Sequence, residues 1–161
     1  MSDDTASDSP VIPALPALLA RLERLETTEA ARTAAYRYAQ AIDTPDFEML
    51  AAVFAPDATL TTRRGTRHSR ETIVEYYREA LAAPIARRHF IVNQQVTWIA
   101  PGEALMRSTF LYTFAGDATS ILGWGGYVDR VIVQEGIGVI VEKTITVDVH
   151  ADSRTGWAEQ A

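Results

Sequence analysis

Apolar residues recur at helical spacing in three stretches of the first half of the chain. Their spacing is that of helices that bury one face. Thr44 and Pro45 are suited to start the second helix, Ser69 is suited to cap the third, and Pro84 is suited to end it. The predicted helices span residues 17–42, about 45–55 and about 70–82.

In the second half the pattern changes to an alternation of apolar and polar residues, rich in Val, Ile, Phe, Thr and Trp, which is typical of strands. Three helices followed by four strands indicate an α+β fold. We expect a strongly curved antiparallel sheet wrapped around about three N-terminal helices, a cone with an apolar interior. Three glycines between residues 123 and 126 suit such curvature. The predicted strands span residues 88–99, 104–114, 119–133 and 139–149, with a further short strand at residues 58–62.

The chain of 161 residues is long enough for one domain with a substantial core. Residues 1–16 are rich in Ser, Asp, Ala and Pro, which predicts a disordered or loosely docked tail. Residues 17–150 form the single predicted domain, and residues 151–161 form a polar C-terminal tail.

Charge and composition exclude several classes of partner. The net charge of -6 argues against nucleic acid and against anionic membrane surfaces. No apolar run is long enough to span a bilayer, and the acidic start of the chain is unlike a secretory signal, so we expect a cytoplasmic protein. The absence of cysteine excludes disulfides, thiol nucleophiles and thiolate metal sites.

Sequence motifs for cofactors are also missing. The three histidines are far apart and show no paired metal-ligand spacing, so no metal is expected. There is no glycine-rich phosphate loop and no G-x-S-x-G nucleophile motif. We therefore expect no cofactor, and acid–base chemistry on a small molecule remains as the enzymatic interpretation.

His89 is the most informative residue of the predicted strands. Alternation places it on one face with Ile91, Asn93 and Gln95, whereas Phe90, Val92, Val96 and Trp98 occupy the other. If the strand face that carries His89 lines the interior of the cone, the His89 imidazole and the Asn93 carboxamide lie in an apolar cavity. Asp43, at the junction of the first two helices, is the best partner for His89, because a carboxylate fixes the tautomer of a histidine base. The alternatives are a half-buried edge histidine and a capping aspartate.

Other side chains are weaker candidates. Lys143 lies among apolar residues of the last strand, where it would stabilise an oxyanion or a leaving group, or else pack its stem and place its ammonium at the rim. Arg107 is a similar case on the second strand. Four aromatic residues are candidates to line the cavity and bind a polar substrate, or else to pack in the core: Tyr38, Tyr112, Trp124 and Tyr127.

Several segments resemble known proteins. YRYAQAIDTPDFEMLAAVFAPDATL is similar to the start of SnoaL-like proteins of the nuclear transport factor 2-like (cystatin-like α+β cone) superfamily. SRETIVEYY resembles the third helix of that family, RRHFIVNQQV its histidine-bearing strand, and GWGGYVDRV its Gly-x-Tyr-x-Asp strand. Within the superfamily, the arrangement is most similar to the branch of scytalone dehydratase, bile acid 7α-dehydratase and hexachlorocyclohexane dehydrochlorinase.

The resemblance implies a specific chemistry. Lyases of that branch use a His–Asp dyad, and its positions correspond to His89 and Asp43. A second active-site histidine of scytalone dehydratase has no counterpart in the following strand, LMRSTFLYTF. The leading hypothesis is a cofactor-independent dehydratase acting on a small, mostly apolar, cyclic metabolite. A ketosteroid-isomerase-like isomerase or polyketide cyclase and a non-catalytic binding module are the alternatives. We also expect a homo-oligomer, with a trimer favoured over a dimer.

Overall fold

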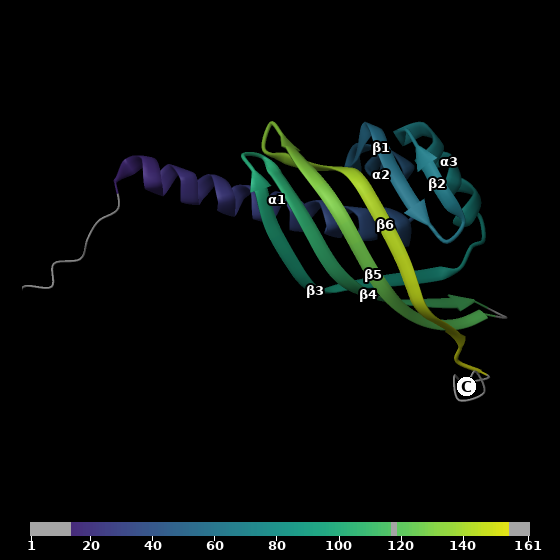
Figure 1. The fold of residues 1–161 in the computed structure, drawn as a ribbon. Helices are drawn as coiled ribbons and strands as arrows, with labels where there is room; N and C mark the ends of the chain where they lie inside the picture. The colour runs from purple at the N-terminus through teal and green to yellow at the C-terminus, as the bar shows by residue number, and fades with distance from the viewer. Residues whose placement is uncertain (1–13, 117–118, 155–161) are drawn as a thin grey trace, which may run out of the picture.

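The computed structural model describes residues 14–116 and 119–154, so most of both predicted tails lies outside the described residues. A long helix is followed by a short helix, a hairpin, a third helix and four long strands (Figure 1). The elements are α1 (Leu15–Asp43), α2 (Phe47–Val53), β1 (Phe54–Thr62), β2 (Gly65–His68), α3 (Arg70–Ala80), β3 (Ala86–Ala100), β4 (Glu103–Gly116), β5 (Thr119–Gln134) and β6 (Ile137–Asp152). No helix among them is long and apolar enough to cross a membrane.

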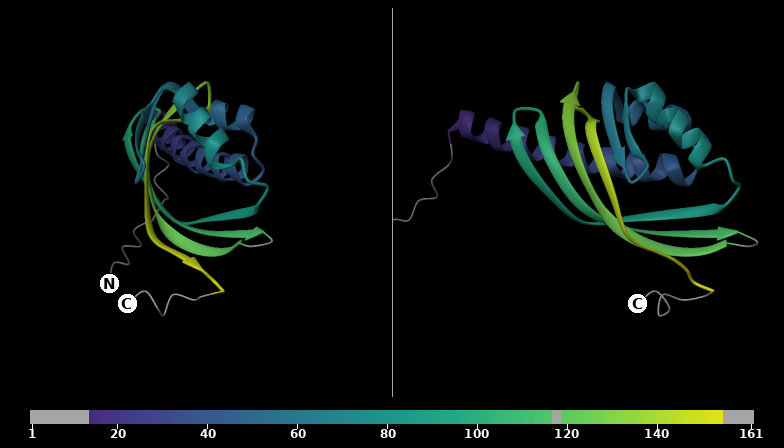
Figure 2. Two further views of the ribbon diagram at one scale, coloured as in Figure 1. Left: turned by 90° about the vertical axis from the view of Figure 1, so that its right-hand side faces the viewer. Right: turned by 45° about the vertical axis from the view of Figure 1, so that its right-hand side comes forward.

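The strands form one curved sheet in the order β2-β1-β6-β5-β4-β3. Strands β3 to β6 are an antiparallel meander, as predicted, and β1 pairs with β6 in parallel, so the sheet as a whole is mixed. The long stretch of chain between β1 and β6 permits this parallel pairing, which a short hairpin would not. All three helices lie on the concave side, which gives the α+β cone that the sequence predicts (Figures 1 and 2).

The junction between α1 and α2 determines where Asp43 lies. Helix α1 ends at Asp43, and the Thr44 hydroxyl donates back to the Gln40 carbonyl. Asp46 caps α2, because its carboxylate accepts from the Met49 backbone N–H at 2.9 Å. The predicted Thr44 cap is therefore wrong, and Asp43 is not needed to cap α2.

Small residues allow α1 to pack closely on the sheet. Ala31, Ala34 and Ala35 are almost completely buried at this interface. Gly138 in β6 is required here, because a Cβ atom at this position would lie 2.4 Å from the Ala30 carbonyl oxygen. This close packing holds the C-terminal half of α1, and with it Asp43, against the concave face.

A β-bulge in β3 changes which side chains face the helices. The register with β4 shifts between Val92 and Gln95, and Asn93 adopts a left-handed backbone with φ of 51°. Beyond the bulge, Gln94 accepts a hydrogen bond from the Tyr36 hydroxyl on α1. Trp98 also turns inward and lies 4.5 Å from the Arg24 guanidinium of α1.

The prediction of a single inner face along β3 is therefore wrong after residue 92. Asn93 and Gln95 are exposed, and Val96 packs against the core instead of facing out. On the convex face, Phe90 and Val92 keep 50% and 45% of their surface exposed. The N-terminal part of α1 projects beyond the sheet (Figure 1). This part of the helix carries five exposed leucines: Leu15, Leu18, Leu19, Leu22 and Leu25.

Candidate active site

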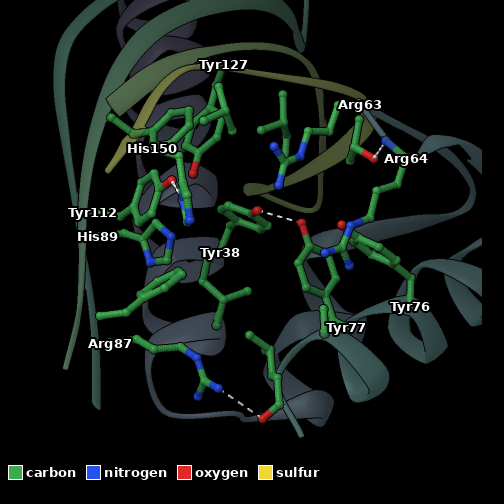
Figure 3. Close-up of a pocket in the computed structure, with 18 of the residues that line it drawn as sticks. Tyr38, Arg63, Arg64, Tyr76, Tyr77, Arg87, His89, Tyr112, Tyr127 and His150 are labelled. Carbon is green, nitrogen blue, oxygen red and sulfur yellow. Dashed lines mark hydrogen bonds between the residues drawn. The ribbon is translucent and has the colours of Figure 1, made fainter. Parts of the chain in front are cut away.

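A cavity of about 290 Å³ opens between the curved end of the sheet, the C-terminal end of α3 and the turn between β1 and β2. Most of its wall is aromatic or aliphatic, with a few polar groups directed inward (Figure 3). Apolar cavities with a small number of polar side chains are typical of small-molecule sites. The cavity is open rather than filled by side chains, which is one condition that a binding or catalytic site must meet.

Asp43 and His89 form a close pair at this cavity. Nδ1 of His89 lies 2.6 Å from Oδ1 of Asp43, and the His89 backbone N–H donates to Oδ2 at 3.0 Å. Both carboxylate oxygens therefore bind one residue, which restricts the rotation of both side chains. The two side chains are only 9% and 10% exposed.

The geometry selects one tautomer of neutral His89. A carboxylate only accepts hydrogen bonds, so Nδ1 carries the proton and Nε2 keeps a free lone pair. The His89 ring lines the cavity, whereas Asp43 lies behind it. The arrangement can therefore present a base to a molecule in the cavity while the carboxylate stabilises the imidazolium that forms.

Neighbouring strands hold the His89 ring in place. His89 pairs with Tyr112 across β3 and β4, and the two rings stack with centroids 5.8 Å apart. Tyr112 and Phe110 lie over glycines of β5: a Cβ atom at Gly123 would be 2.4 Å from the Tyr112 ring, and one at Gly125 would be 2.9 Å from the Phe110 ring. The glycines therefore make room for the aromatic wall, which is the close approach that the sequence predicts.

Tyr112 contacts a second histidine that the sequence did not reveal. Its hydroxyl lies 2.6 Å from Nδ1 of His150 near the end of β6. Simple alternation from Val147 would direct His150 to the convex face. The register between β5 and β6 shifts by one residue at this point, so that both Val147 and His150 pair with inward-facing glycines. The bulge leaves Asp148 without a partner in β5, and alternation of apolar and polar residues along β6 does not reveal it.

Three tyrosines form the floor of the cavity. The hydroxyls of Tyr38 and Tyr77 are 2.6 Å apart, and the Tyr127 ring meets the Tyr38 ring edge-on. Burial raises the pKa of all three phenols well above the ordinary value. They therefore stay protonated at neutral pH and act as hydrogen-bond donors. Tyr38 and Tyr127 line the cavity as predicted, and Tyr77 is an additional member.

Lys143 is not placed where either sequence-based interpretation expected it. Its ammonium is completely buried, contacts both carboxylate oxygens of Asp129 at 2.9 and 3.1 Å, and does not line the cavity. It also lies 3.7 Å and 4.1 Å from the ring centroids of Tyr127 and Tyr38. Burial lowers the pKa of Lys143 and raises that of Asp129. The pair therefore supports the tyrosine floor from behind.

Three further predicted site residues do not reach the cavity. Asn93 is exposed in the bulge of β3, and Arg107 is exposed on β4. Trp124 alternates with the inward-facing Gly123 and Gly125, so its side chain is directed to the convex side of β5. Both Arg107 and Trp124 were assigned to the cavity because alternation alone does not say which face of a strand is concave.

Three arginines that sequence reasoning did not single out line the cavity: Arg63, Arg64 and Arg87. Arg87 is buried, and its Nη2 donates to the carbonyls of Ala83 and Leu81 at 2.6 and 3.2 Å. It therefore ties the start of β3 to the segment after α3. Within the described part of the chain, no group of three or more His, Asp or Glu side chains is arranged to hold a metal ion.

Residues 23–142 match the family described as "SnoaL-like domain". The chain belongs to the SnoaL-like domain family. As the resemblance predicted, this places it in the nuclear transport factor 2-like superfamily. A search among curated proteins found no match.

Solved structures show the same SnoaL-like fold. The hexachlorocyclohexane dehydrochlorinase LinA-type3 from Novosphingobium barchaimii LL02 is 15% identical, with a TM-score of 0.73 over 82% of this chain and 93% of its own. A protein assigned as a scytalone dehydratase from Novosphingobium aromaticivorans DSM 12444 is 19% identical, with a TM-score of 0.74 over 81% and 89%. A protein of unknown function with a cystatin-like fold from Nostoc punctiforme PCC 73102 is 25% identical, with a TM-score of 0.66 over 79% and 92%.

The family and the α+β cone that the sequence predicts are thus confirmed. A fold of this kind hosts many activities, so the function of this SnoaL-like protein has to be argued from its cavity.

Proposed function

We propose that this SnoaL-like protein is a cofactor-independent lyase that eliminates water from a small cyclic metabolite. The observation that carries the proposal is the 2.6 Å contact between Asp43 and His89 at the wall of an apolar cavity. The family, together with structural neighbours described as a dehydratase and a dehydrochlorinase, supports a lyase-type or isomerase-type enzyme acting on small molecules.

In the proposed reaction, Nε2 of His89 takes a proton from a carbon next to a carbonyl group. Asp43 stabilises the resulting imidazolium, and the electrons of the C–H bond form the new carbon–carbon double bond as the C–O bond breaks. The tyrosine floor donates hydrogen bonds to the carbonyl oxygen as negative charge develops there, which is most effective in a site with little water. Tyr38 and Tyr127 are the donors that line the cavity.

The departing hydroxide requires a proton, and in the proposed reaction Tyr112 supplies it. Burial raises the pKa of Tyr112, opposed by the nearby Arg63 guanidinium, so the phenol is protonated at neutral pH. As Tyr112 gives its proton to the hydroxide, it recovers one from Nδ1–H of a doubly protonated His150, 2.6 Å away, and His150 becomes a neutral imidazole. His89 then loses a proton to solvent and His150 gains one, so that water and the alkene are the only products.

An isomerase is the second candidate, and the tyrosine floor is the observation that favours it. A hydrogen-bonded pair of phenols, Tyr38 and Tyr77, suits an enolate, whose proton His89 would then return to a different carbon. The mass of the product separates the two reactions, since elimination removes one water and isomerisation removes nothing. A non-catalytic binding module is the remaining alternative, for which we expect either a separated pair or a filled cavity. The close Asp43–His89 contact at an open cavity supports a catalytic site over such a module.

The base can be tested before the substrate is identified. Nitrobenzisoxazole is a neutral aromatic compound whose ring opening needs only the removal of a proton from carbon and releases a coloured phenolate. We expect His89→Gln to lower kcat/KM for this probe by roughly 10²–10⁴-fold. Asp43→Asn should lower it as well, because the amide no longer stabilises the imidazolium.

His68→Gln is the matched control, since His68 is exposed on β2 and does not line the cavity. It should leave kcat/KM unchanged. Circular dichroism would establish that each variant is folded. Wild-type activity in a folded His89→Gln variant would refute the proposed role of His89.

A further inference from the structure

We propose that the substrate carries a carboxylate, and that Arg63 and Arg64 bind this group at the mouth of the cavity. The inference rests on the proposed function in taking this cavity as the substrate site. It adds a chemical class to the substrate, which otherwise needs only to be small and mostly apolar.

The first support is the distribution of charge. The chain has 21 acidic and 15 basic residues, yet the cavity is lined by three arginines and two histidines and by no aspartate or glutamate. In an acidic protein, such a concentration of cations at one apolar opening favours an anionic ligand.

The second support is that the two guanidinium groups are free. Neither Arg63 nor Arg64 has a side-chain hydrogen bond or ion pair with any residue that the structure describes. Arg130, by contrast, contacts Glu103 at 2.7 Å and Glu142 at 3.2 Å. Figure 3 shows both arginines reaching from the β1–β2 turn toward the space between Tyr127 and Tyr77.

The third support is the construction of the turn that carries them. The Arg64 backbone N–H donates to the Thr62 hydroxyl at 3.1 Å, and the hydroxyls of Thr61 and Thr66 are 3.2 Å apart. Gly65 has φ of 103°, a conformation that suits glycine and strains other residues. The turn therefore has a defined conformation that holds both arginines at its tip.

A purely structural role for the two arginines would be to bind the free carbonyls at the C-terminal end of α3. Two of those carbonyls already have partners: the Tyr77 carbonyl accepts from the Leu81 backbone N–H, and the Leu81 carbonyl accepts from Arg87. The planar guanidinium instead matches the two oxygens of a carboxylate, with which it forms paired hydrogen bonds.

The proposal is tested with naphthoate and naphthamide substituted at the same ring position. The two probes have the same rings and nearly the same shape, but only naphthoate is charged. Calorimetric titration should show that wild-type protein binds naphthoate about tenfold or more tightly than naphthamide, as expected for a charge-assisted contact. This preference should shrink as salt is added.

The decisive variant is Arg63→Gln with Arg64→Gln. It should lose the preference for naphthoate while keeping its affinity for naphthamide. The control, Arg107→Gln with Arg21→Gln, removes the same charge from exposed positions outside the cavity and should keep the preference.

His89→Gln should also keep the preference, which separates this test from the test of the base. If His89→Gln fully retains nitrobenzisoxazole activity, the proposed function fails while the anion site stands. Equal affinity of wild-type protein for the two probes, no binding of naphthoate, or a preference that survives in the Arg63→Gln, Arg64→Gln variant would each overturn the carboxylate assignment.

Discussion

Replacing Asp129 by Asn tests how the tyrosine floor is supported. The change keeps the size of the side chain and one oxygen acceptor but removes the negative charge next to the Lys143 ammonium. Both side chains of the pair are 0% exposed, so no water replaces the lost charge. The variant therefore leaves a buried ammonium without a counter-charge.

The magnitude follows from this burial. Removing one partner of a buried ion pair typically costs about 3–5 kcal/mol of the free energy of unfolding. Asp129→Asn should fall in that range, which is a large part of the roughly 5–15 kcal/mol that stabilises a typical domain. Combining it with Lys143→Met removes the orphaned charge, and most of the loss should be recovered.

The same variant should show a pH dependence of defined sign. Burial lowers the pKa of Lys143 below its ordinary 10.5, and loss of Asp129 removes the charge that opposes this shift. A lysine whose pKa is lower in the folded than in the unfolded state makes the folded state less favourable when it is protonated. The folded state is therefore favoured above the unfolded-state pKa, and this advantage is lost as pH falls through the folded-state pKa. The loss in free energy of unfolding that Asp129→Asn causes relative to wild type should therefore become smaller as pH rises toward 10.5.

Urea denaturation of wild type and variants measures these free energies. Glu142→Gln is the control on the strand that carries Lys143, because the Glu142–Arg130 pair is 61% and 43% exposed and should be worth only about 0–1 kcal/mol. A loss below about 1 kcal/mol for Asp129→Asn would refute a buried, charged pair, given the usual cost of orphaning a buried ion.

Two further predictions follow from packing and from exposed surface. Gly123→Ala should lower the free energy of unfolding by about 1–3 kcal/mol and displace Tyr112, because the added Cβ would lie 2.4 Å from the Tyr112 ring. Gly126→Ala is the matched control, since no atom would lie closer than 3.8 Å to its Cβ. Equal stability of the two variants in thermal melts would contradict this packing. We also expect a homo-oligomer, with a trimer favoured, that covers the exposed Phe90 and Val92. Light scattering should give the trimer mass for wild type and a lower mass for Val92→Glu, and a wild-type monomer would disprove the expectation.

The elements and the contact between Asp43 and His89 were predictable because they rest on local patterns. The period of apolar residues changes from helical to alternating near residue 86, and Asp43 and His89 stand at the ends of elements that a cone brings together. The pair needed no exact register, since a junction and the start of a strand define their positions.

The face of the sheet on which a side chain lies could not be predicted where it depends on the register between strands. The bulges at Asn93 and before His150 reverse the faces of β3 and β6, and each arises from pairing with a neighbouring strand. This is why the Tyr112–His150 contact was missed and Asn93 was wrongly placed in the cavity. The ion pair of Lys143 was not predicted for a related reason. Its partner Asp129 lies opposite it on the neighbouring strand β5 and is not close to it in the sequence.

The most direct test of the account is the protonation pattern of the His89 ring. A long-range proton–nitrogen correlation spectrum of uniformly labelled protein, recorded at a pH where the ring is neutral, reports which nitrogen carries the proton. We predict a proton on Nδ1 and a free lone pair on Nε2 in wild type, because Asp43 accepts from Nδ1 at 2.6 Å. A neutral His89 that carries its proton on Nε2 would contradict the account, since no base would then face the cavity.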